Sequence, residues 1–234
     1  MHRNWTHPRG STATLRTKHT SASSEASTNY GRGAGCQDEF RAVASRKGEL
    51  FLLTTPFIEF FTVPTVTFQL LYCFFVIEHG RRRILHFNVT RHPTAEWVIQ
   101  QLREAFPEAR PYRYAVFDRD STFNADVVTF LKATGLNPKR TSVQAPWQNG
   151  IAERWVESCR REILDHVIAL NEPHLRRLIR DYVNYHHEDR IHDSLKKDTP
   201  NRRTVEPKPA ANATLISMPR LGGLHHRYAW REAA

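Results

Sequence analysis

The longest uncharged stretch of the chain runs from Phe60 to Ile77, 18 residues that are mostly apolar. Its length reaches the lower limit for a membrane-spanning helix. Pro64 and Gln69 interrupt it, however, and its β-branched and aromatic residues favour strands over a helix. We therefore predict two strands joined at Pro64 and Thr65, with a membrane-inserted helix as the alternative.

Beyond this stretch, the spacing of apolar residues alternates between the period of a strand and that of a helix. The strands are expected at 57–63, 68–78, 83–90, 113–117 and 139–143, and the helices at 94–106, 124–133, from 152 onward and at 173–187. Three strands in hairpin connection, followed by strand-helix-strand, predict a mixed five-stranded sheet flanked by helices, an α/β fold. After Pro200 we expect irregular chain, with 221–230 as a candidate strand pair.

Two carboxylates stand where these elements end or begin. Asp118 follows the apolar run Tyr114–Phe117, which places it at the C-terminal end of a buried strand. Glu153 lies in the first turn of a helix that Asn149 is expected to cap. Its position at the margin of the apolar stripe predicts a half-shielded carboxylate. Taken alone, Glu153 could also serve only to favour the positive end of the helix dipole.

The segments around these acids resemble those of a known family. Phe117-Asp-Arg-Asp-Ser-Thr-Phe123 and Gln148-Asn-Gly-Ile-Ala-Glu-Arg154 are similar to the second and third acidic motifs of the DDE-type integrase catalytic core, found in insertion-sequence transposases and retroviral integrases. The segment from Tyr185 to Leu195, followed by Thr199-Pro200, is similar to the closing motif of that family. The resemblance covers about Pro56 to Pro207 and implies a ribonuclease H-like fold.

The resemblance also implies a chemistry, namely metal-dependent cleavage of phosphodiester bonds and strand transfer during DNA integration or transposition. In such enzymes three carboxylates hold two Mg²⁺ or Mn²⁺ ions. The resemblance assigns the catalytic and metal-binding roles to Glu59, Asp118 and Glu153, with Asp120 as the fallback for Asp118. The family carries aspartate at the first position, so the longer Glu59 is expected to shift its carboxylate by roughly 1 Å and to impair catalysis.

A formal net charge of +10 and a pI near 9.9 favour a polyanionic partner. The resemblance implies that this partner is DNA, both transposon ends and target, bound by a homo-oligomer. The candidate DNA contacts are Arg154, Arg160, Arg161, Gln148 and Asn149. The arginines could equally form a solvated helix face with Glu157 and Glu162. Trp147 could stack on a base or anchor its loop, and Arg176 is expected to face solvent.

The first 50 residues contain 17 Ser, Thr or Gly and few large apolar side chains. Such a composition cannot bury enough surface to offset its chain entropy, which predicts a disordered or degenerate segment. It does not read as a secretory signal, and a transit peptide is the less favoured alternative. We therefore divide the chain into 1–50, an integrase-like core at 51–207 and a tail at 208–234, and expect a cytoplasmic protein without a membrane anchor.

Two functions remain open at this point, beside the less favoured hypothesis of a membrane-anchored protein with Phe60 to Ile77 inserted. The chain is either an active DNA strand transferase or a transposase-derived DNA-binding module that keeps the fold and has impaired catalysis. Three widely spaced cysteines argue against both a disulfide framework and a zinc finger. An assay of strand transfer with labelled donor DNA ends distinguishes the active enzyme from the DNA-binding module directly.

Overall fold

The computed structural model describes residues 55–107, 112–142 and 146–232, so the predicted disordered segment 1–50 lies outside the described residues. Five strands form one sheet in the order β3-β2-β1-β4-β5. They are β1 (Pro56–Pro64), β2 (Leu70–Glu78), β3 (Ile84–Thr90), β4 (Tyr114–Phe117) and β5 (Asn137–Arg140). The pairs β1–β2 and β2–β3 are antiparallel, whereas β4 lies parallel to both β1 and β5. The predicted mixed five-stranded sheet is confirmed.

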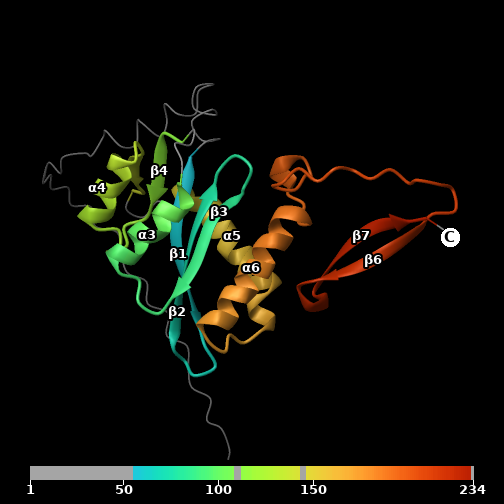
Figure 1. Cartoon of the computed structure of the whole chain (residues 1–234), viewed down its shortest axis with the longest axis horizontal. Helices are drawn as coiled ribbons and strands as arrows, with labels where there is room; N and C mark the ends of the chain where they lie inside the picture. Colours follow the sequence, from blue (N-terminus) through green and yellow to red (C-terminus); the bar gives the residue numbers. More distant parts are fainter. Residues whose placement is uncertain (1–54, 108–111, 143–145, 233–234) are drawn as a thin grey trace, which may run out of the picture. The chain divides into compact units, whose positions relative to one another are not determined.

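Helices cover both faces of this sheet (Figure 1). The helices are α3 (Ala95–Ala105), α4 (Ala125–Ala133), α5 (Gly150–Glu162) and α6 (Glu172–Glu188). Successive side chains of β1 point to opposite faces of the sheet and pack in two separate cores. Phe57 and Phe61 pack with α5 and α6, whereas Ile58 packs with α3 and α4. Odd-numbered positions of β1 therefore face α5, which decides where the side chain of Glu59 points.

The uncharged stretch Phe60–Ile77 forms most of the β1–β2 pair, with its turn at the predicted place. Phe75 of this pair packs against Trp155 of α5 with ring centroids 4.4 Å apart. Aromatic burial of this kind stabilises a sheet against a helix. Within the described part of the chain, no helix is both long enough and apolar enough to cross a membrane.

The structure corrects the prediction of the fifth strand and of the tail. The fifth strand begins at Asn137, whose N–H bonds the carbonyl of Arg113, and it ends at Arg140 because β4 stops at Phe117. The tail is not irregular but forms an antiparallel hairpin of β6 (Thr214–Arg220) and β7 (His225–Arg231). Gly222 and Gly223 adopt positive φ values of 68° and 97° in its turn, where glycine carries no side-chain strain.

The hairpin is fixed to α6 by charge and by a ring contact. Arg220 and Arg227 place nitrogens 2.5 and 3.4 Å from the carboxylate of Asp189, a side chain that is only 5% exposed. The ring of His225 stacks on that of Tyr185 with centroids 4.8 Å apart. A shielded carboxylate with two cationic partners holds the end of α6 to the hairpin.

Four histidines, one buried (His186) and three half-buried, gather around the C-terminal half of α6 and the β2–β3 turn. Burial lowers the pKa of His79, His187 and His192 to about 4, and that of His186 well below its ordinary value. The Nε2 atom of His187 accepts a hydrogen bond from the backbone N–H of Ile84 at 2.8 Å, which requires that nitrogen to be unprotonated. These side chains are therefore neutral in the folded protein.

We expect the melting temperature to fall as pH drops from about 6.5 to 4. In the unfolded chain these histidines take up protons near pH 6.5, whereas in the folded chain they stay neutral down to about pH 4. Because the unfolded state binds more protons between these values, lowering the pH shifts the equilibrium toward unfolding. Thermal melts across this range measure the slope. The slope should decrease in His187→Gln and stay unchanged in His92→Gln, which alters an exposed histidine. A flat profile would contradict the assignment.

Candidate active site

The pairing of β1 with β4 brings Glu59 and Asp118 together. These strands are parallel, with Phe57 opposite Val116 and Ile58 opposite Phe117. The next residues are Glu59 on β1 and Asp118 directly after β4. Their backbones therefore lie about 4.8 Å apart and their side chains point to the same face. That face is covered by α5.

The first carboxylate is held in place by its neighbours. Oε1 of Glu59 accepts a hydrogen bond from the N–H of Phe60 at 3.2 Å, and Oε2 accepts one from Nδ2 of Asn149. Asn149 precedes α5 and is 5% exposed, and its Oδ1 has no hydrogen-bond partner. Asn149 occupies the predicted N-cap position of α5, but it makes no side-chain bond to its own helix and instead reaches across to β1.

The two carboxyl groups are harder to ionise than separate carboxyl groups in water. Burial, followed by the charge of Asp118, raises the pKa of Glu59 to about 8. Burial also raises the pKa of Asp118, which accepts a hydrogen bond from Glu59. When two neighbouring carboxyl groups are shielded from water, ionising both costs free energy, because the two negative charges repel each other. Glu59 therefore keeps its proton at neutral pH in the metal-free protein.

Asp120, the alternative to Asp118 as the second metal ligand, makes hydrogen bonds within its own turn instead. Its Oδ1 accepts hydrogen bonds from the N–H and the hydroxyl of Thr122, at 2.8 and 2.6 Å. Its N–H donates to Oδ1 of Asp118 at 2.9 Å, which orients the Asp118 carboxylate. Asp120 is exposed, so its side chain belongs to the loop surface rather than to the shielded pair.

Glu153 lies in the first turn of α5, four residues after Asn149 and therefore about 6 Å further along the helix axis. Its side chain is exposed, not half-shielded as predicted. Among the described residues no group of three or more His, Cys, Asp or Glu side chains is arranged to hold a metal ion. The structure thus joins Glu59 and Asp118 and leaves Glu153 as a separate carboxylate on the helix that covers them.

Some of the candidate DNA-binding residues make contacts within the protein, and others are exposed at its surface. Arg160 donates to the carbonyl of Thr62 at 2.9 Å and covers the ring of Phe61, so it belongs to the α5–β1 packing. Gln148 accepts a hydrogen bond at 2.6 Å from the N–H of Ser142 and so closes its loop.

Two arginines of the same helix stay available at its surface. Arg154 is exposed, and its charge, after burial, lowers the pKa of Arg82. Arg161 is 68% exposed and approaches Glu162 only to 3.7 Å. The side chain of Trp147 lies outside the described part of the chain.

The donor set fits a divalent cation of the magnesium type. Two carboxyl groups face each other, and the unpartnered Oδ1 of buried Asn149 adds a neutral oxygen nearby. Hard oxygen ligands are those that Mg²⁺ and Mn²⁺ prefer. A cation would also offset the burial and the mutual repulsion that raise the pKa of Glu59.

Sheet order, helix placement and this acidic pair define the class of the domain, a ribonuclease H-like α/β domain with carboxylates on its central strands. Comparisons with known proteins agree with that class. Residues 134–200 match the family model described as the integrase core domain. No curated protein matches this sequence.

Solved structures show the same fold. A chain of the simian T-cell lymphotropic virus intasome in complex with the PP2A regulatory subunit B56 gamma gives a TM-score of 0.54 at 10% identity, over 77% of this chain and 67% of that chain. The HTLV-2 integrase catalytic core domain in complex with magnesium, in a trimeric form, gives 0.50 at 8% identity, over 63% and 93%. The predicted fold and the resemblance to integrase catalytic cores are confirmed.

The link between Asn149 and Glu59 is the part of the site that sequence reasoning missed. The two residues are 90 positions apart, and Asn149 reads in the sequence as a helix cap or a DNA contact. A signal exists only in retrospect, since Asn149 precedes the helix of Glu153 and is placed to face the strand that carries Glu59.

Proposed function

We propose that this chain is a metal-dependent DNA strand transferase of the DDE type, which acts on DNA as a homo-oligomer. One observation carries the proposal: β1 and β4 set the carboxyl groups of Glu59 and Asp118 side by side under the helix of Glu153. The match of residues 134–200 to the integrase core domain supports it. Glu59, Asp118 and Glu153 are the proposed catalytic and metal-binding residues.

In this proposal the protein side chains hold the metal ions and orient the DNA, and none of them attacks the substrate. Glu59 and Asp118 supply oxygen ligands, Asn149 fixes the longer Glu59 side chain, and Glu153 completes the set from α5. When bound, two Mg²⁺ or Mn²⁺ ions supply Lewis-acid stabilisation to an in-line displacement at phosphorus by water or a DNA 3′-hydroxyl. Exposed Arg154 and Arg161 are placed to neutralise backbone phosphates.

The second candidate function is a DNA-binding module with impaired catalysis. It is favoured by the extra methylene of Glu59 and by the exposure of Glu153 away from the acidic pair. In that case the shielded pair would be a remnant, and affinity for DNA would come from the basic charge of the chain.

The test is a pair of measurements on the native chain and on Glu59→Asp, with Glu157→Asp on the exposed face of α5 as control. We expect Mn²⁺ to raise the melting temperature, because a ligand at 100 times its dissociation constant stabilises a fold by about 2.7 kcal/mol. Strand transfer of a labelled donor end should rise about tenfold to a hundredfold in Glu59→Asp, since the shorter side chain restores ligand reach. Absence of both the melting shift and transfer in every variant would leave the DNA-binding module as the function.

A further inference from the structure

One polar atom beside the acidic pair has no hydrogen-bond partner. Asn149 is 5% exposed, and its Oδ1 is buried without a partner in the protein. Native proteins keep few such atoms, because an acceptor that is cut off from water destabilises the fold unless another group satisfies it. The oxygen therefore identifies a place where a water molecule or a ligand can bind.

The side chain of Asn149 is fixed against the acidic pair. Its Nδ2 donates a hydrogen bond to Oε2 of Glu59, 90 positions away in the sequence. The oxygen and the nitrogen of an amide are bonded to the same carbon and lie about 2.2 Å apart. Oδ1 of Asn149 is therefore a near neighbour of the Glu59 carboxyl group, which lies beside Asp118 across the β1–β4 pair.

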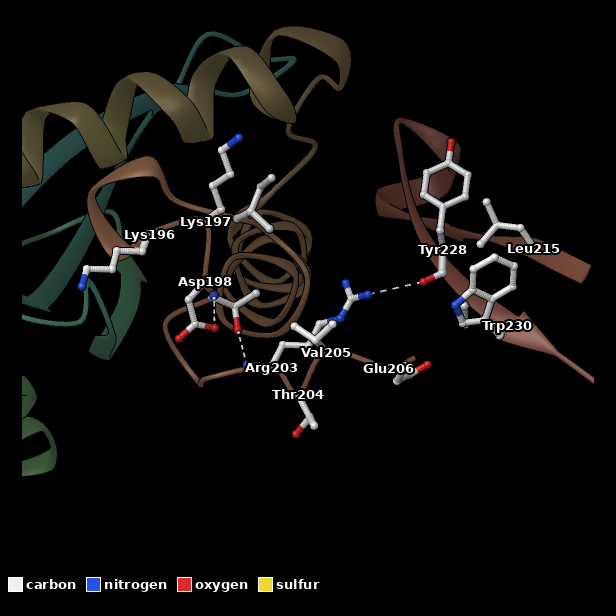
Figure 2. A pocket seen from close by; sticks show the side chains of 13 residues that line it. Lys196, Lys197, Asp198, Arg203, Thr204, Val205, Glu206, Leu215, Tyr228 and Trp230 are labelled. Atoms are coloured by element: carbon white, nitrogen blue, oxygen red, sulfur yellow. Dashed lines mark hydrogen bonds between the residues drawn. The ribbon is translucent and has the colours of Figure 1, made fainter. Parts of the chain in front are cut away.

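The groove between the hairpin and the chain that follows α6 differs from this site (Figure 2). It has a volume of about 450 Å³, and none of its described lining residues carries an unpartnered buried side-chain atom. Asp198 pairs with Arg81 at 2.7 Å, and Arg203 donates to the carbonyl of Tyr228 at 3.4 Å. Within the described ranges, Asn149 is the residue that combines an unpartnered buried atom with a hydrogen bond to a proposed metal ligand.

We propose that Asn149 binds the divalent cation between Glu59 and Asp118 directly, through Oδ1. This inference rests on the metal-dependent function proposed above and adds a residue to its metal site. Ionised carboxylates and the amide oxygen are all acceptors. A water molecule has only two protons to donate to the three groups, whereas one cation is bound by all three at once. Amide and carboxylate oxygens both suit Mg²⁺ and Mn²⁺.

The ligand role gives the amide of Asn149 two tasks. Nδ2 orients the carboxyl group of Glu59, and Oδ1 supplies a neutral oxygen to the same ion. The protein ligands of this ion then come from β1, from the residue after β4 and from the start of α5. Glu153, exposed one turn further along α5, is left for the second ion of the proposed site.

The test detects the contact in the native chain, made with asparagine that carries carbon-13 in its side-chain carbonyl. With Mn²⁺ kept below the protein concentration, electron–nuclear double resonance measures the coupling between the bound ion and nearby carbon-13. A carbon whose oxygen binds the ion lies roughly 3 Å from it. If Asn149 only donates to Glu59, its carbon lies about 1.5 times further away, and a dipolar coupling that falls with the cube of distance drops to roughly a third. We expect the full coupling.

Variants assign the coupling and measure the affinity. Asn149→Asp removes the labelled carbon but keeps an oxygen ligand, so the coupling should disappear while Mn²⁺ stays bound. Asn149→Ala should weaken Mn²⁺ binding about tenfold or more, measured from the resonance of free Mn²⁺, since even outer-shell partners contribute that much to metal affinity. Asn184→Ala makes the same change at an exposed position of α6 and should alter neither quantity. A native coupling at the weaker level, or one that persists in Asn149→Asp, would overturn the ligand role.

The ligand role and the proposed strand transfer can fail separately. Full carbon-13 coupling without Mg²⁺-dependent strand transfer would leave Asn149 as a ligand and refute the enzyme. Strand transfer with the weaker coupling would refute the ligand role and leave the enzyme standing. Mn²⁺ that fails to bind the native chain would overturn both.

Discussion

Replacing Asp118 with asparagine is expected to reduce Mg²⁺-dependent strand transfer by about a thousandfold while making the metal-free fold more stable. Loss of one charged group at a site that stabilises developing negative charge costs roughly 4 kcal/mol of barrier. Burial, followed by the charge of Asp118, raises the pKa of Glu59 to about 8. The substitution removes the second cause, so the metal-free protein should melt at a higher temperature above pH 7. Strand transfer and thermal melting, each with and without Mg²⁺, measure both effects.

Asp120→Asn is the matched control, because it makes the same chemical change two residues away. Asp120 is exposed, and its bonds to Thr122 stay within the loop. This variant should therefore keep most of the activity and should not gain stability. Strand transfer that survives in Asp118→Asn at the native level would mean that the two facing carboxylates have no catalytic role.

Replacing Arg190 with alanine is expected to destabilise the fold by about 3 kcal/mol, because it leaves a shielded carboxylate without its cation. Arg190 donates through Nε and Nη2 to Glu162 at 2.8–3.1 Å, and Glu162 is only 11% exposed. Burial alone would raise the pKa of Glu162, but the hydrogen bonds and charge of Arg190 hold it below its ordinary value. For a domain of this size the melting temperature should fall by about 6–12 °C.

The control for this change lies on the same carboxylate. Arg161 approaches Glu162 to 3.7 Å but is 68% exposed, so Arg161→Ala should cost less than about 1 kcal/mol. Glu162→Gln combined with Arg190→Ala should recover part of the loss, since no charge then stays buried. Equal destabilisation by the two arginine variants would show that net charge, and not shielding, determines the effect.

Most of the fold could be predicted from the sequence, because its apolar residues recur with the spacing of strands and helices. The β-branched and aromatic residues of Phe60–Ile77 identified strands where length alone suggests a membrane helix, and in the structure the side chains of this stretch alternate between two cores. Strand ends were less predictable, because the ladder of β5 depends on how far β4 extends and not on the residues of β5 itself. The candidate strand pair at 221–230 covered the turn and most of β7, but β6 at Thr214–Arg220 was missed.

The site was predictable in its residue types but not in its geometry. A helical wheel places Glu153 near the apolar stripe, yet it cannot tell how far neighbouring chain covers that position, and the side chain is exposed. The same limit applies to Arg176, which was expected to face solvent. It bonds the side chain of Asn88 and the carbonyl of Val89 on β3, because α6 crosses the sheet at that strand. Contacts between distant segments decide both cases.

The ion pairs of Asp189 have a consequence for how the protein can be divided. Arg220 and Arg227, both on the C-terminal hairpin, are its ion-pair partners within the described ranges, and the carboxylate is 5% exposed. A chain shortened at Pro207, where the resemblance to integrase cores ends, would lose both cations together with the ring that covers Tyr185. We therefore expect that the boundary of the resemblance is not a boundary of folding, and that a piece keeping both cations beside Asp189 must extend through β7.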